Sequence, residues 1–167
     1  MRIGKLLGKS QQVIKLLNDY QERVEAMQTA LGKRLNDLEV SIARFYWDGR
    51  TDTQNHPSYF AGCILQDIGF SIPIKQRQVD THSSSMSISL ERLDLLDGDI
   101  MFAVISRSID SEEYFKKYLK NPLWQKLKVV QTNQIFKVDG SYWLWGSVLG
   151  ANAVLDDLFK YLVEDKT

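Results

Sequence analysis

Residues 99–105 read DIMFAVI, an aspartate followed by an unbroken apolar run. Gly98 precedes this run and Ser106 follows it, which limits it to the length of a single strand. A strand that is apolar on both faces is typical of a parallel sheet covered by helices on each side. We therefore expect a buried parallel strand at this place in the chain.

Segments on either side of this strand predict how the rest of the sheet is built. LEVSIARFY at 38–46 and QIFKV at 134–138 have the composition of two more strands. Apolar spacing predicts helices at 58–68, 89–96, 111–119 and 146–162, and the polar, serine-rich stretch 75–87 predicts a surface loop. Strand and helix alternate without repeats, so the expected fold class is α/β: a single Rossmann-like lobe with a mostly parallel sheet flanked by helices.

A long helix is expected before the lobe, over residues 10–31. Apolar residues recur there in steps of three and four, at Val13, Leu17, Tyr20, Val24, Met27 and Leu31. A helix of this length extends about 33 Å and carries one apolar stripe. The stripe fits a helix packed along its own domain, and it also fits a short coiled-coil dimer, so both interpretations stay open.

Composition excludes several classes of protein. The 167 residues contain 21 Lys and Arg and 21 Asp and Glu, so the net charge is zero. This balance argues against a general nucleic-acid binder, which needs an excess of basic charge. No apolar run approaches the ~20 residues that span a bilayer. The single cysteine, Cys63, excludes an internal disulfide and a Cys-based zinc site.

No set of residues in the sequence has the spacing of a catalytic or metal site. Neither G-x-x-x-x-G-K-[ST] nor G-x-S-x-G occurs. His56 and His82 lie in separate loops without a partner at metal-ligand spacing. Asp94, Asp97 and Asp99 cluster before a strand, where we expect them to serve turns and helix ends. We therefore expect no catalytic residue, no metal ligand and no enzyme.

Aromatic and basic residues gather where the predicted strands end. In an open α/β sheet, ligands bind outside the carboxyl ends of the strands. Guanidinium groups pair with carboxylates or phosphates, and aromatic rings cover apolar ligand surface. The expected ligand is therefore anionic and partly apolar, and it is bound rather than transformed. The candidate ligand-binding residues are Arg44, Tyr46, Trp47, Arg50, Arg107, Trp143 and Trp145.

These candidates have structural interpretations as well. Tyr46 and Trp47 point to opposite faces if the strand is regular. Trp143 and Trp145 fit equally well as residues that close the core under the last helix, because Trp is usually buried. Trp124 is expected in the core.

The chain also resembles a known family, the binding proteins of ABC importers for iron(III) siderophores, of the ferric-dicitrate and ferrichrome type. Five stretches carry the resemblance in the family's order: IGKLLGKSQQVIKLLNDYQERV, YFAGCILQDIGFSIP, ISLERLDLLDGDIMFAV, NPLWQKLKVVQTNQIFKVD and WGSVLGANAVLDDLFKYL. Together they cover most of the chain.

The resemblance implies a two-lobed protein in which one long helix joins two α/β lobes and the ligand lies between them. Residues 1–36 would then contain the connecting helix, and residues 37–167 would form the C-terminal lobe. The implied partners are a ferric siderophore or ferric citrate and an ABC importer permease. The chelator would supply the iron ligands, so no protein cofactor is expected, and the full-length protein would be a monomer outside the cytoplasm. Haem or a cobalamin is a further ligand class, and the absence of a placed axial histidine disfavours haem.

One position departs from the resemblance. Members of the family dock to the permease through a surface glutamate on the helix after the first strand of the lobe. Gly62 stands near that place in this sequence, and Asp67 is the nearest acidic residue. Docking through this helix is therefore in doubt.

Overall fold

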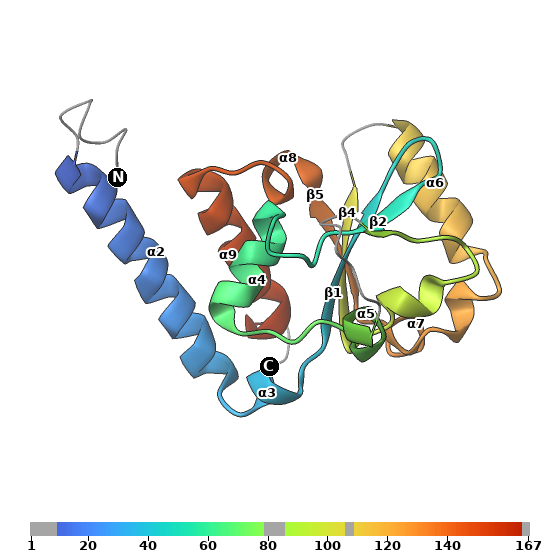
Figure 1. The fold of residues 1–167 in the computed structure, drawn as a ribbon, viewed down its shortest axis with the longest axis horizontal. Coiled ribbons are helices and arrows are strands. Elements are labelled where there is room, and N and C mark those ends of the chain that lie inside the picture. Colours follow the sequence, from blue (N-terminus) through green and yellow to red (C-terminus); the bar gives the residue numbers. More distant parts are fainter. Residues whose placement is uncertain (1–9, 79–85, 106–108, 165–167) are drawn as a thin grey trace.

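The computed structural model describes residues 10–78, 86–105 and 109–164. Within them lies a five-stranded sheet with the order β3-β2-β1-β4-β5 (Figure 1). Strands β1, β4 and β5 run parallel to one another. The strands are β1 Val40–Phe45, β2 Thr51–Thr53, β3 Met86–Ser87, β4 Ile100–Ile105 and β5 Ile135–Asp139.

All three predicted strands are confirmed, and they form the parallel part of the sheet. Phe45 of β1 lies opposite Ile105 of β4, and Ile105 lies opposite Asp139 of β5. The three carboxyl ends therefore meet at one edge of the sheet. The short strands β2 and β3 were not predicted, because they are brief and polar, and they add an antiparallel margin beside β1.

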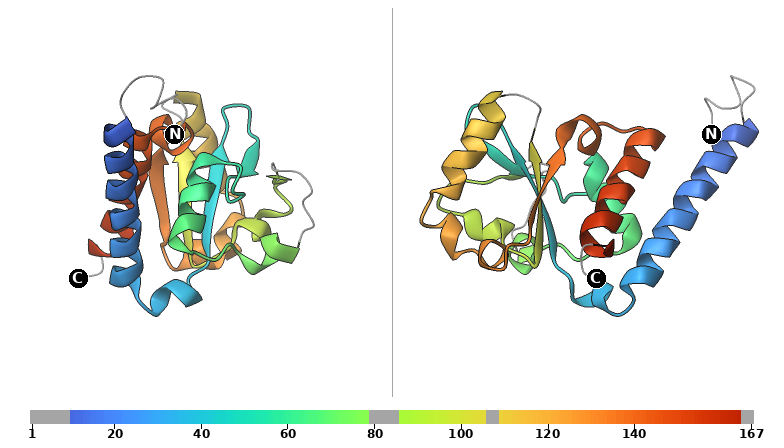
Figure 2. Two further views of the ribbon diagram at one scale, coloured as in Figure 1. Left: turned by 60° about the vertical axis from the view of Figure 1, so that its left-hand side comes forward. Right: turned by 180° about the vertical axis from the view of Figure 1, so that it is seen from behind.

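The DIMFAVI strand is buried on both faces, as its composition predicts. Ile100, Phe102 and Val104 face the core shared with α2, α4 and α9. Met101, Ala103 and Ile105 face a second core, which includes residues of α6, η2 and α7. Figures 1 and 2 show these helices as two layers on opposite sides of the sheet.

The helices expected at 10–31, 58–68, 111–119 and 146–162 are present, whereas the short helices α3, α7 and α8 were not predicted and residues 74–96 differ from the expectation. The helix expected at 89–96 reduces to a 3-10 turn, and a short helix, α5, begins the segment expected to be a loop. Within the described residues, no helix is long and apolar enough to cross a membrane. The helices are α2 Ser10–Leu31, α3 Arg34–Asp37, α4 Phe60–Ile68, α5 Ile74–Gln78, η1 Leu93–Leu96, α6 Ile109–Leu119, η2 Trp124–Lys126, α7 Lys128–Gln131, α8 Gly140–Trp143 and α9 Val148–Leu162.

Helix α2 packs on the lobe along only part of its length. Its second half buries Val24, Met27 and Leu31 against α4 and α9. Its first half leaves Ile14 and Leu17 45% and 46% exposed. Figure 2 shows the helix diverging from the lobe towards its N-terminal end. The predicted stripe is therefore continuous in sequence, while its contact with this lobe begins at Tyr20, whose hydroxyl donates to Asp67 of α4.

Candidate functional site: a rim at the carboxyl edge of the sheet

A tight turn joins β1 to β2 at the carboxyl edge of the sheet. The Tyr46 N–H donates to the Arg50 carbonyl at 3.0 Å, and Gly49 takes a left-handed conformation with φ 85°. The hydroxyl of Tyr118 on α6 donates to the Gly49 carbonyl at 3.0 Å and accepts from the Thr51 hydroxyl at 2.7 Å. These bonds fix the turn that carries three of the seven candidate residues, Tyr46, Trp47 and Arg50, and a fourth, Arg44, lies in β1 just before it.

Two guanidinium groups lie against the ring of Tyr46. The Cζ atom of Arg44 is 4.2 Å from the ring centroid, and that of Arg50 is 4.8 Å from it. Burial, together with a hydrogen bond to Asp52, raises the pKa of the Tyr46 hydroxyl above its ordinary value. Tyr46 is therefore a neutral aromatic platform at physiological pH, and cation–π attraction places both positive charges beside it.

Arg44 and Arg50 differ in their ionic partners. Arg50 donates from Nε to the Asp48 carboxylate at 2.7 Å, and this bond holds the pKa of Asp48 below its usual range. Arg44 is half-buried, its Nε is shielded from solvent, and it has no hydrogen bond or ion pair with any part of the chain that the structure describes. A shielded guanidinium with free donors favours an anionic partner from outside the lobe.

Strand alternation sets where Arg44 points. Ile42 faces the core beneath α4 and α9, and Arg44, two residues later, projects from the same face of β1.

Tyr59, just before α4, lies close enough to Tyr46 to influence its pKa. Tyr59 and Phe60 are half-buried, and neither was among the predicted site residues. A sequence signal existed, since both residues open the helix expected at 58–68 after the first predicted strand, and helices that follow parallel strands begin at the carboxyl edge.

Trp47 and Trp145 are exposed beside this edge. Trp47 follows β1 and is 63% exposed, and Trp145 lies between α8 and α9 and is 68% exposed. The loop of Trp145 approaches the start of α4, because a Cβ on Gly146 would lie 3.6 Å from the Phe60 ring. We name the group Arg44, Tyr46, Trp47, Arg50 and Trp145 the rim.

Trp143 does not belong to the rim. Its side chain is fully buried, and its ring centroid lies 4.9 Å from that of Phe102 in β4. The Nε1 of Trp143 donates to the Asp157 carboxylate at 2.8 Å. The short helix α8 turns this residue inward, so its assignment to the ligand site was wrong and the core interpretation holds. Trp124 is also in the core, as predicted.

Arg107 lies outside the described residues, so the structure does not place this candidate. Ile105, the last residue of β4, lies opposite Phe45 of β1. Arg107 therefore remains a prediction from the sequence.

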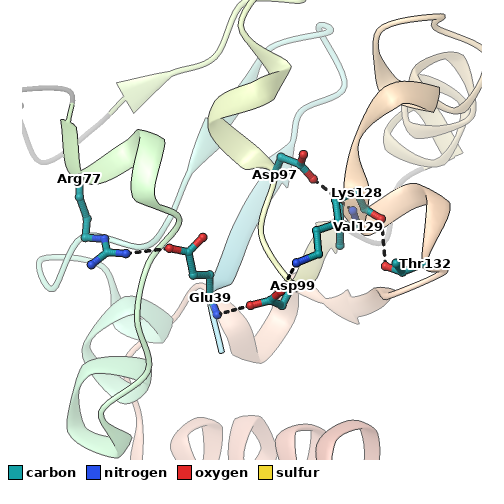
Figure 3. A network of polar contacts seen from close by, with 7 residues as sticks. All are labelled: Glu39, Arg77, Asp97, Asp99, Lys128, Val129 and Thr132. Atoms are coloured by element: carbon teal, nitrogen blue, oxygen red, sulfur yellow. Dashed lines mark hydrogen bonds and ion pairs between the residues drawn. The ribbon is translucent and has the colours of Figure 1, made fainter. Parts of the chain in front are cut away.

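The opposite edge of the sheet holds a closed network of charges (Figure 3). Asp99 accepts from the Glu39 N–H at 2.8 Å and from Lys128 Nζ at 2.6 Å. Asp97 accepts from the Val129 N–H at 3.1 Å, at the start of α7. These carboxylates bind backbone N–H groups and one lysine, and Asp97 takes the helix-end role that the sequence predicts.

Two of the hollows formed by the described residues lie beside α4. One, of about 330 Å³, lies beside α4 and α5 and is lined in part by Asn55, Gln76 and Arg77. The other, of about 210 Å³, adjoins the rim and is almost entirely apolar. We name the second hollow the apolar groove, and its lining residues are Leu16, Leu17, Tyr20, Phe60, Cys63, Ile64, Asp67, Ser147, Val148 and Ala151. No group of His, Cys, Asp and Glu within residues 10–78, 86–105 and 109–164 is arranged to hold a metal ion.

Gly62 and Asp67 have structural roles on α4. A Cβ on Gly62 would lie 2.4 Å from the His56 carbonyl oxygen, so the helix packs directly on the preceding loop. Asp67 accepts a hydrogen bond of 2.8 Å from the Tyr20 hydroxyl of α2. The acid nearest to the expected docking position therefore links α4 to the long helix.

Comparison with known proteins agrees with this architecture. A family model described as "Periplasmic binding protein" matches residues 1–142. The achromobactin-binding periplasmic protein of Dickeya dadantii is 29% identical over 161 residues, covering 93% of this chain and 52% of that protein. The Fe(3+)-citrate-binding protein YfmC of Bacillus subtilis is 27% identical over 143 residues, covering 84% of this chain and 41% of that protein.

A solved structure matches almost the whole chain. The crystal structure of Staphylococcus aureus SirA complexed with staphyloferrin B superposes with a TM-score of 0.81 at 28% identity, covering 96% of this chain and 58% of that one. The chain thus spans about half the length of the curated relatives it matches.

Proposed function

Because this chain belongs to the periplasmic binding protein family, we propose that it captures a ferric siderophore or ferric citrate outside the cytoplasm for delivery to an ABC importer. The relatives named above are binding proteins for achromobactin, Fe(3+)-citrate and staphyloferrin B. No covalent step is required, since the chelator holds the iron and the protein holds the chelate.

Arg44 carries this proposal. It is a half-buried guanidinium at the carboxyl edge of the sheet, stacked on Tyr46 and without an acidic partner among the residues that the structure describes. An anionic ferric chelate offers carboxylate oxygens to such a group through charge-assisted hydrogen bonds. The exposed rings of Trp47 and Trp145 lie beside the same edge and offer apolar cover for the chelate.

Titration of tryptophan fluorescence tests the proposal. Ferric citrate and panels of ferric hydroxamates and catecholates are added to the chain and to a longer protein that carries both lobes, with iron-free chelators as controls. We expect saturable quenching by one iron-loaded class, and reduced quenching in Trp145→Phe. Trp124→Phe removes a buried indole on the other face of the sheet and is the matched control. The absence of saturation in the two-lobed protein with every chelate would overturn the proposal.

The apolar groove suggests how this lobe joins a second one. The first half of α2 exposes Ile14, Leu16 and Leu17, and the loop before α9 exposes Trp145 on the other side of the groove. We propose that residues 1–36 contain the connecting helix and that residues 37–167 form the C-terminal lobe of a two-lobed protein. On this proposal the exposed half of α2 packs on the N-terminal lobe.

A dimer formed through residues 10–31 is the competing interpretation. Val24, Met27 and Leu31 are buried against the lobe. Only the first half of the stripe would therefore remain available to a coiled coil. Such a contact is shorter than the three to four heptads that a clear coiled-coil pattern needs. Sedimentation velocity at several concentrations decides between the two, and a two-lobed protein that remains dimeric on dilution would favour the coiled coil.

A further inference from the structure

The lobe carries a concentrated positive charge on the side of the sheet away from α2. Residues 114–138 contain six lysines and no acidic residue, in a chain whose net charge is zero. Lys128 is paired with Asp99 at 2.6 Å, and Lys137 with Glu112 at 3.0 Å. The remaining four, Lys116, Lys117, Lys120 and Lys126, are exposed and form no ion pair within the described part of the chain.

These four lysines lie on one compact corner of the fold. Lys116 and Lys117 lie in the last turn of α6, Lys120 directly follows that helix, and Lys126 ends η2, which contacts α6. Gln125 Nε2 donates to the Leu119 carbonyl at 2.6 Å, and the Asn121 carboxamide accepts from the Leu123 N–H at 2.8 Å. We name the surface formed by Lys116, Lys117, Leu119, Lys120, Leu123 and Lys126 the lysine corner.

The lysine corner is rigid because buried aromatic rings support it from beneath. Trp124 of η2 is fully buried, and its ring centroid lies 6.2 Å from that of Phe115 and 6.0 Å from that of Tyr118 on α6. The Phe45 ring of β1 completes the cluster. The rings therefore hold the backbone of α6 and η2, which carries the lysines, in a fixed relative position.

Stabilisation of the α6 helix dipole accounts for only two of the four lysines. Lys116 and Lys117 lie in the last turn of α6, where cations stabilise the helix dipole. Lys120 and Lys126 lie after that turn, and the corner also exposes two leucines, Leu119 at 39% and Leu123 at 43%. Glu113, one turn earlier on α6, forms no ion pair within the described residues.

We propose that the lysine corner docks on the anionic headgroups of a phospholipid bilayer. Compact ammonium groups on flexible stems suit a diffuse layer of phosphate charge, and a cluster of four or more lysines has the charge density that anionic lipids attract. The two exposed leucines supply apolar contact at the boundary between headgroups and acyl chains. The rim lies at the carboxyl edge of the sheet, where α6 begins, whereas the lysine corner lies at the end of α6 (Figure 1).

Co-sedimentation of the whole chain with vesicles tests the proposal. We expect binding to phosphatidylcholine vesicles that contain phosphatidylglycerol, little binding to phosphatidylcholine alone, and loss of binding as the ionic strength rises. The variant with Lys116→Gln, Lys117→Gln, Lys120→Gln and Lys126→Gln together should weaken binding at least tenfold, because each lysine near such a surface adds to the attraction. The corresponding Lys→Arg variant should retain binding.

A control variant tests whether vesicle binding depends on the position of these lysines or only on the net charge of the protein. Lys→Gln at the exposed Lys15, Lys33, Lys75 and Lys160 changes the net charge by the same amount from other surfaces of the molecule. It should leave vesicle binding close to that of the unchanged protein. Equal loss in both variants, equal binding to neutral vesicles, or binding to heparin without binding to vesicles would each overturn the proposal. Circular dichroism confirms that every variant is folded, and the ferric-chelate titration is read independently on the same proteins.

Discussion

Trp143 and Asp157 are joined by a hydrogen bond of 2.8 Å that links the short helix α8 to the last helix, α9. The same carboxylate oxygen accepts from the Tyr142 hydroxyl at 3.0 Å, and burial with this bond raises the pKa of Tyr142 far above its ordinary value. The Asp157 side chain thus fixes the positions of two consecutive aromatic residues, Tyr142 and Trp143. The path of the following loop, which carries Trp145, depends on this anchor.

Replacing Asp157 by Ala should destabilise the lobe by about 1–3 kcal/mol, because it leaves the buried Nε1 of Trp143 without an acceptor. Asp157→Asn keeps an acceptor oxygen and should lose less. Urea denaturation followed by far-UV circular dichroism measures both. Equal stability of Asp157→Ala and the unchanged protein would show that the bond contributes nothing.

Gly62→Ala should be strongly destabilising. A Cβ at this position would lie 2.4 Å, 2.6 Å and 2.8 Å from the carbonyl oxygens of His56, Gln54 and Asn55. Backbone oxygens cannot rotate away as a side chain can, so we expect the upper part of the overpacking range, about 3 kcal/mol. Thermal unfolding gives the difference.

Gly146→Ala is the control for this substitution. Its Cβ would make one ordinary contact of 3.6 Å, with the Phe60 ring. Its effect should stay within about 0.5 kcal/mol of zero. Similar losses at Gly62 and Gly146 would contradict the packing argument.

Cys63 should react slowly with iodoacetamide near neutral pH, although it is exposed. Partial burial and the nearby Asp67 carboxylate both raise the pKa of the thiol, which reduces the reactive thiolate at a given pH. The rate should rise as the pH increases through the raised pKa. Asp67→Asn removes the negative charge, lowers the pKa and should move the pH–rate profile to lower pH, whereas Asp37→Asn on α3 should leave it unchanged.

The parallel sheet could be predicted because its strands carry a local signal. Ile100–Ile105 is apolar at every position, and burial on both faces follows directly from that composition. The short antiparallel strands could not be predicted in this way. Thr51–Thr53 and Met86–Ser87 are short, and they are strands because β2 pairs with β1 and β3 pairs with β2, not because of their own residues.

The rim was only partly predictable, for a related reason. The order of strands brings Arg44, Tyr46, Trp47 and Arg50 to the carboxyl edge, and this much follows from a parallel sheet. Whether the tryptophan side chains after β5 point into the core or into solvent depends on α8, a helix of four residues without a clear sequence signal. Trp143 and Trp145 are two positions apart, and the first is buried while the second is exposed.

Arg44 and Arg50 provide the sharpest test of the rim as a ligand site. Both guanidinium groups contact the Tyr46 ring, and only Arg50 has an acidic partner within the described residues, namely Asp48. In a two-lobed protein, Arg44→Met should weaken ferric-chelate binding about tenfold, which corresponds to about 1.4 kcal/mol for one charge-assisted pair. Arg50→Met should have a smaller effect, because the Asp48 carboxylate already neutralises that cation and surface pairs of this kind contribute little. Fluorescence titration at two salt concentrations measures both, and a Kd for Arg44→Met that equals that of the unchanged protein would remove Arg44 from the site.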